Sequence, residues 1–116
     1  MIRKTIKNNR LDYGMRKIIV GKKSDIPLGK MIKTSVDGKE IVIVNSDGNY
    51  YAIDDTCTHS GASLSEGKLQ DSTVKCGWHG AEFDCKSGKL TKFPAKIRDL
   101  KSYKVVLESD TVSIEV

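Results

Sequence analysis

Two short stretches, Cys57-Thr58-His59-Ser60-Gly61-Ala62 and Cys76-Gly77-Trp78-His79-Gly80, decide how this chain is interpreted. Each places one cysteine and one histidine two or three residues apart. They contain both histidines of the chain and two of its three cysteines, so chance placement is a poor explanation. Two such loops lying side by side would offer two thiolates and two imidazoles to one metal centre.

Zinc is an alternative occupant, because Zn²⁺ accepts the same four ligands. Structural zinc sites usually take a close cysteine pair from one turn and a histidine pair from elsewhere, whereas here each loop mixes one cysteine with one histidine. A zinc-stabilised interaction module therefore stays open at this point. Colour would separate the two interpretations, since a zinc protein is colourless.

Outside the two loops the pattern is that of β-strands. Asp37-Gly38 is a strong two-residue hairpin signal, and the β-branched run 41–44 suits a strand that is buried on both faces. Residues 54–68 are rich in turn-forming residues and are expected to form a loop. No amphipathic helix of three turns is found. Strands are expected at 17–20, 31–36, 39–44, 50–53, 103–108 and 111–116, with shorter extended segments at 73–75, 82–84 and 89–90.

These patterns predict an all-β fold, an antiparallel sandwich or barrel with an inserted two-loop subdomain at about residues 55–92. The length of 116 residues suggests one domain, expected over residues 16–116 after an irregular tail at 1–15. No apolar run approaches the roughly 20 residues of a membrane-spanning helix, and the N-terminus lacks a secretory signal. We therefore expect a cytoplasmic protein without a membrane span.

The formal net charge of +5 is concentrated in the first third of the chain, which carries many lysines and arginines. Such an excess is either a solvated face or a docking patch for an acidic protein partner. Binding to nucleic acid is not expected, because the basic residues are not interleaved with aromatic ones.

The two cysteine–histidine motifs resemble the two ligand loops of Rieske proteins and Rieske-type ferredoxins. The resemblance covers about residues 17–116, and its specific part lies at 55–95. Further positions match the layout of that family: Leu64, Gly67, Gly80-Ala81-Glu82-Phe83-Asp84, Ser87-Gly88 and Phe93-Pro94-Ala95.

The resemblance implies one [2Fe–2S] cluster per chain, with one iron on Cys57 and Cys76 and the other on His59 and His79. Two neutral imidazoles in place of two thiolates make the cluster less negative and raise its reduction potential. The family also implies roles for the neighbours. Gly61, Gly77 and Gly80 would let the backbone bend around the cluster, and an apolar cover would come from Leu64, Trp78 and Pro94.

Departures from the family pattern indicate its low-potential subtype. High-potential members carry an additional cysteine in each loop, which form a disulfide, and here these positions are Ala62 and Trp78. They also place serine and tyrosine hydroxyls against the cluster sulfurs, where this chain has Ala81 and Phe83. Family members often carry proline at the position of Gly77, so the stiffness of that loop is open.

The resemblance implies a small one-electron carrier that exchanges electrons with a reductase and a terminal oxygenase or similar partner. An acidic docking face on that partner is the expectation if the basic excess of this chain forms a patch. An alternative is a small subunit of an oxygenase or nitrite-reductase-like complex. No substrate-site motif accompanies the loops, so the chain is not expected to be an enzyme by itself. Cys85 is left over and is expected to be structural.

Overall fold

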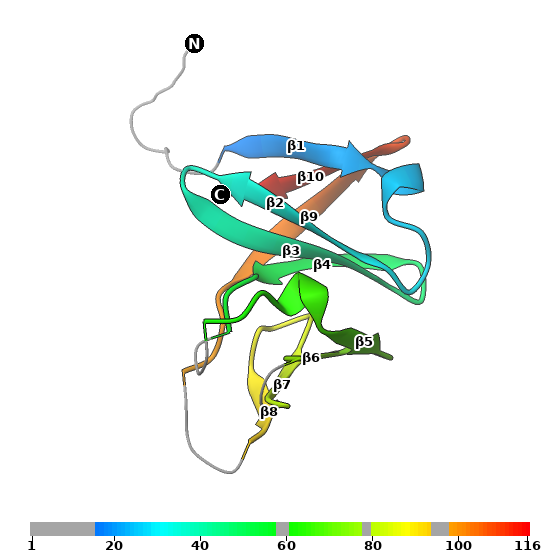
Figure 1. Ribbon diagram of the computed structural model, residues 1–116. Helices are drawn as coiled ribbons and strands as arrows, with labels where there is room; N and C mark the ends of the chain where they lie inside the picture. The colour runs from blue at the N-terminus through cyan, green and yellow to red at the C-terminus, as the bar shows by residue number, and fades with distance from the viewer. Residues whose placement is uncertain (1–15, 58–60, 78–79, 94–97) are drawn as a thin grey trace.

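The computed structural model describes residues 16–57, 61–77, 80–93 and 98–116. These residues form two antiparallel sheets, one of six strands in the order β1-β10-β9-β4-β3-β2 and one of four strands in the order β5-β6-β7-β8. The six-stranded sheet fills the upper half of Figure 1 and the four-stranded sheet the lower half. The expected all-β fold is confirmed.

The strands are short, and the described helical elements are single 3-10 turns, η1 (Lys23–Asp25) and η2 (Leu64–Glu66). No helix in the described part of the chain is long and apolar enough to cross a membrane. The strands are β1 (Lys17–Lys22), β2 (Met31–Val36), β3 (Lys39–Ser46), β4 (Asn49–Asp54), β5 (Lys68–Gln70), β6 (Thr73–Lys75), β7 (Glu82–Asp84), β8 (Leu90–Lys92), β9 (Ser102–Glu108) and β10 (Thr111–Glu115).

The hairpin predicted at Asp37-Gly38 is present between β2 and β3. Both turn residues have positive φ, 53° and 81°, as a type I′ turn requires. The two strands pair in register along their whole length, from Met31 with Val44 to Val36 with Lys39. The turn chemistry of two residues thus sets the register of β3, which contributes four fully buried side chains to the core.

β3 is buried on both faces and separates two apolar cores. Ile41 and Ile43 point into one core, Val42 and Val44 into the other, and all four are 0% exposed. The first, here the barrel core, consists of Ile26, Val36, Ile41, Ile43, Ala52, Tyr103, Val112 and Ile114. The second, here the loop-side core, consists of Val42, Val44, Ile53, Cys57, Ala62, Leu64, Val74, Cys76, Ala81, Phe83, Cys85 and Leu100.

The segment predicted as a loop at 54–68 contains more structure than expected. It includes the turn η2 and leads into β5, which forms a hairpin with β6. β5 is three residues long and offers one apolar side chain, the half-buried Leu69, so it carries no alternating pattern long enough to indicate a strand. The turn residue Asp71, with φ 56°, is the local signal that was missed.

Candidate metal centre

The two predicted cysteine ligands lie together in the loop-side core. Cys57 is 2% exposed and Cys76 is 1% exposed, and neither forms a disulfide. The predicted ligands His59 and His79, and the predicted cover residues Trp78 and Pro94, lie outside the described residues.

The first ligand loop, here loop 1, runs from Cys57 to Ala62. The backbone N–H of Cys57 donates to the carbonyl of Ala62 at 2.9 Å, and the N–H of Gly61 donates to the carbonyl of Cys57 at 2.9 Å. Gly61 has a φ of 76°, a left-handed conformation that glycine adopts without steric cost. The loop therefore closes on itself around its cysteine.

The second ligand loop, here loop 2, runs from Cys76 to Ala81 and repeats this geometry. The N–H of Cys76 donates to the carbonyl of Ala81 at 2.8 Å, and the N–H of Gly80 donates to the carbonyl of Cys76 at 3.2 Å. Gly80 has a φ of 75°. The two loops thus present their cysteines in the same way.

Gly77 differs from these two glycines. It does not have positive φ, and a Cβ placed there would approach its nearest neighbour, the carbonyl oxygen of Glu66, only to 3.8 Å. The bend that was expected to need three glycines therefore depends on Gly61 and Gly80. A closer approach is found at Gly67, where a Cβ would lie 2.0 Å from the carbonyl oxygen of Lys75.

The apolar side chains predicted around the centre are fully buried where they are described. Leu64, Ala81 and Phe83 are each 0% exposed in the loop-side core. Phe83 lies on β7 and pairs with Val74 of β6 directly behind loop 2. Because these groups exclude water, the environment of the cysteines on the core side is apolar and has a low dielectric constant.

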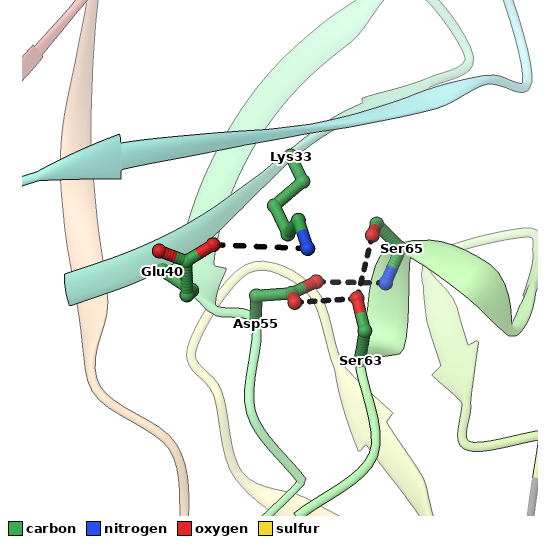
Figure 2. A network of polar contacts seen from close by, with 5 residues as sticks. All are labelled: Lys33, Glu40, Asp55, Ser63 and Ser65. Atoms are coloured by element: carbon green, nitrogen blue, oxygen red, sulfur yellow. Dashed lines mark hydrogen bonds and ion pairs between the residues drawn. The ribbon is translucent and has the colours of Figure 1, made fainter.

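The ends of the two loops are held by different means. Loop 2 connects β6 and β7, whose backbones pair from Thr73–Asp84 to Lys75–Glu82. Among the described residues, loop 1 has only the isolated bridge between Thr56 and Ser63 at its base. There the carboxylate of Asp55, which sequence reasoning missed, accepts hydrogen bonds from the Ser63 hydroxyl and the Ser65 N–H, as Figure 2 shows. The signal that could have identified it is an aspartate two residues before a buried cysteine.

The molecular surface beside the two cysteines differs in charge. A hollow of about 450 Å³ at Cys57 is lined by basic and acidic groups alike, Lys39 and Arg98 with Glu40, Asp54 and Asp99. A smaller hollow of about 220 Å³ at Cys76 is lined by Lys68, Lys75, Gly77 and Gly80, without an acidic side chain. The Cys76 side of the centre is therefore the basic one.

Cys85 belongs to the same core but has a different character. It is 0% exposed, and burial, reinforced by the charge of Asp84, raises the pKa of its thiol to about 11. A thiol with a raised pKa remains protonated and is a poor nucleophile. Its backbone N–H donates to the carbonyl of Ser72 at 2.8 Å, which ties the end of β7 to the β5–β6 turn.

The residues present fit a [2Fe–2S] cluster with mixed ligands. Thiolates are the ligands that iron–sulfur clusters require, and two free, buried cysteines sit in loops of one geometry within one core. Among the described residues no group of three or more cysteine, histidine or carboxylate side chains forms an alternative site.

Comparison with known proteins agrees with this donor set. The Rieske [2Fe-2S] domain is the family whose model matches residues 16–104. The ferredoxin component of the naphthalene 1,2-dioxygenase/salicylate 5-hydroxylase systems of Ralstonia sp. is 36% identical over 92 residues, which are 79% of this chain and 88% of that protein. The ferredoxin subunit of 3-phenylpropionate/cinnamic acid dioxygenase of Shigella flexneri is 36% identical over 103 residues, 88% of this chain and 95% of that protein.

Solved structures show the same similarity in three dimensions. A ferredoxin of Sphingomonas yanoikuyae B1 superposes with a TM-score of 0.80 at 26% identity, covering 87% of this chain and 99% of that one. A chain of a complex of reduced oxygenase and oxidized ferredoxin in carbazole 1,9a-dioxygenase superposes with a TM-score of 0.79 at 28% identity, covering 84% of this chain and 91% of that one.

Proposed function

The chain belongs to the Rieske [2Fe-2S] domain family, and from that premise we propose that Cys57, His59, Cys76 and His79 bind its cluster. The chain is a ferredoxin that carries electrons, as its relatives in dioxygenase systems are. The zinc alternative is set aside by the family match. The observation that supports the ligand assignment is the repeated loop geometry, which brings two free cysteines into one buried core.

When bound, the cluster supplies one reversible one-electron step. The chain itself holds the thiolates of Cys57 and Cys76 in place through the backbone bonds within each loop. Leu64 and Phe83 keep water away from the core side. Electrons therefore enter and leave on the side of the loops that faces away from the core.

The electron acceptor that we propose is the terminal oxygenase of a multicomponent system. The named relatives are components of dioxygenase systems, and one structural neighbour comes from a complex of ferredoxin with oxygenase. We do not assign catalysis to this chain alone, because among the described residues no large apolar side chain lines the hollows at Cys57 and Cys76. Substrate pockets are predominantly apolar with few polar groups.

The docking face that we propose is the basic side at Cys76. Lys68 and Lys75 are exposed and face each other across the β5–β6 pair, although like charges directly opposite one another are unfavourable in a sheet. Glu82 of β7 lies opposite Lys75 on its other side and balances part of this charge, and a carboxylate of the partner protein would balance the remainder. The three free cysteines of the chain suit a reducing compartment, and we propose the cytoplasm.

We also propose a potential near the low end of the Rieske range, roughly −150 mV. The side chains of Ala81 and Phe83 are fully buried and contain no hydrogen-bond donor. Reduction makes a cluster more negative, so missing donors cost more stability in the reduced form than in the oxidised form. The potential is therefore lowered.

Metal analysis of the purified protein tests the proposal. Two irons and two acid-labile sulfides per chain are expected, with a red-brown colour and an EPR signal after reduction. His59→Ala and His79→Ala should each abolish that signal, while Cys85→Ser should retain it. Stoichiometric zinc in a colourless protein would contradict the assignment.

A further inference from the structure

Asp55 is the only charged side chain that is buried in the part of the chain that the structure describes, with 2% exposure. It follows directly after β4 and lies two residues before Cys57. Burial of a carboxylate in a protein interior is unfavourable unless hydrogen-bond donors compensate for the lost water. The hydrogen-bond partners of Asp55 therefore indicate which segments of the chain the buried carboxylate holds together.

Among the described residues, the donors to the side chain and to the carbonyl of Asp55 are three consecutive residues of the segment that follows loop 1. The hydroxyl of Ser63 donates to Oδ2 at 2.5 Å. The N–H of Ser65 donates to Oδ1 at 2.8 Å, and the N–H of Leu64 donates to the Asp55 carbonyl at 2.7 Å. Figure 2 shows the carboxylate facing both serines, whose hydroxyls are 2.8 Å apart.

On its other side Asp55 is fixed to the large sheet. Its N–H donates to the carbonyl of Glu40 in β3 at 3.0 Å. The side chain of Glu40 pairs with Lys33 at 3.7 Å, and no ion pair to Asp55 is found among the described residues. The charge of Asp55 is thus compensated by hydrogen-bond donors, and the residue joins β3 to residues 63–65.

The corresponding position before loop 2 has a different residue and a different partner. Two residues before Cys76 lies Val74, which is 0% exposed and pairs with Phe83 in the β6–β7 ladder. Strand pairing therefore closes loop 2, whereas in the described part of loop 1 the isolated Thr56–Ser63 bridge is the one strand-like pairing. The Asp55 carboxylate holds the two ends of loop 1 together. The backbone pairing of β6 with β7 does the same for loop 2.

We propose that Asp55 is a positioning residue of the metal centre, which acts through loop 1 by holding Cys57 in its ligand geometry. The inference rests on the proposed function, because it presumes that Cys57 binds iron. Without the carboxylate, residues 63–65 lose two of their three bonds to Asp55 and keep only the backbone bond from the Leu64 N–H, while loop 2 keeps its ladder. The cluster would then be held firmly on one side only.

The experiment uses the iron-loaded protein and three readouts: the rate of iron release to a chelator, the EPR line shape of the reduced form and the midpoint potential. Removing a partner that orients a metal ligand typically lowers metal affinity 10- to 100-fold. We expect Asp55→Ala to release iron about 10-fold faster and to alter the EPR line shape. Asp55→Asn, which retains an acceptor for the Ser65 N–H, should restore most of both.

Asp54→Ala is the matched control. Asp54 is the preceding residue and borders the hollow at Cys57, but its carboxylate accepts from the Tyr103 hydroxyl at 2.6 Å and from the Lys101 N–H at 3.1 Å instead of from residues 63–65. It should lower stability without altering the EPR line shape. The inference is overturned if Asp55→Ala matches the wild type in iron release and line shape, or if Asp54→Ala changes both as strongly.

Ser63→Ala keeps the inference testable if Asp55→Ala does not accumulate as folded protein. It removes the hydroxyl that donates to Oδ2 and leaves the carboxylate in place. Faster iron release from this variant supports the inference, and release at the wild-type rate with an unchanged line shape overturns it. If the wild-type protein itself contains no iron, the proposed function fails rather than the role of Asp55.

Discussion

Loop 1 and loop 2 reach one backbone geometry with two different supports. Within each loop the cysteine N–H bonds to the carbonyl five residues later, and a glycine with φ near 75° makes the turn. Below loop 2 lies a ladder of paired strands, and below loop 1 lies a buried carboxylate. The local motif therefore determines the shape of each loop, while the supporting residues determine which substitutions destabilise it.

The largest loss of stability is expected from a substitution at the point where the segments that carry the two loops touch. Gly67 ends η2, and a Cβ there would lie 2.0 Å from the carbonyl oxygen of Lys75. Gly67→Ala would force the segment after loop 1 away from β6. We expect a loss of on the order of 3 kcal/mol in the free energy of unfolding, measured by urea denaturation of the iron-loaded protein.

Gly77→Ala serves as the control for Gly67→Ala, since its Cβ would have only ordinary contacts. It should change the free energy of unfolding by less than about 0.5 kcal/mol. Equal effects at the two positions would mean that the close approach of η2 to β6 does not constrain the loops.

A smaller and symmetric effect is expected at the two turn glycines. Gly61→Ala and Gly80→Ala each force a residue with a Cβ into the left-handed region, at about 1–2 kcal/mol. Because open space or ordinary contact surrounds both positions, the two losses should agree within about 0.5 kcal/mol. Denaturation curves measured side by side test this, and a large difference would show that the likeness of the loops is only superficial.

Cys85 allows a test by pH, because it lies behind both loops and belongs to neither. Its thiol has a pKa of about 11 in the folded chain, against 9.0 as the ordinary value. The unfolded chain therefore loses this proton first as the pH rises, and stability should fall between about pH 9 and 11. Cys85→Ser should remove this part of the decline in thermal unfolding temperature, and an unchanged decline would exclude Cys85 as its source.

The smallest effect on stability, and the most specific one on redox behaviour, is expected at the fifth residue after each cysteine. Ala81→Ser would introduce a hydroxyl donor at the last residue of loop 2. A hydrogen bond that favours the reduced form by about 1 kcal/mol raises the potential by about 40 mV. Ala62→Ser introduces the same group at the matching position of loop 1. Voltammetry of both variants would show whether a donor raises the reduction potential from loop 1, from loop 2 or from both.

Sequence reasoning could predict those parts of the molecule whose conformation is determined by a few adjacent residues. Asp37-Gly38 determines a turn by its backbone chemistry, and the run 41–44 is apolar enough to be buried on both faces. Both predictions are confirmed. The cysteine motifs also indicated the family, which the match over residues 16–104 confirms.

Other features depend on contacts between distant segments and could not be predicted from local patterns. β5 is recognisable only by its pairing with β6, and the role of Asp55 depends on serines eight and ten residues later. The ligand assignment of His59 and His79, which lie outside the described residues, stays a prediction. So does the division into a tail at 1–15, a domain at 16–116 and a subdomain at about 55–92.

The two-faced burial of β3 has a consequence for the speed of electron exchange. Val42 and Val44 form part of the wall behind the cysteines, and Ile41 and Ile43 pack that wall against a second apolar layer. When the charge of the centre changes by one unit, few dipoles behind it can turn, because the side chains of this wall are apolar and closely packed. The reorganisation energy on that side is therefore small, and the barrier to transfer is set mainly by the solvent that remains where the partner docks.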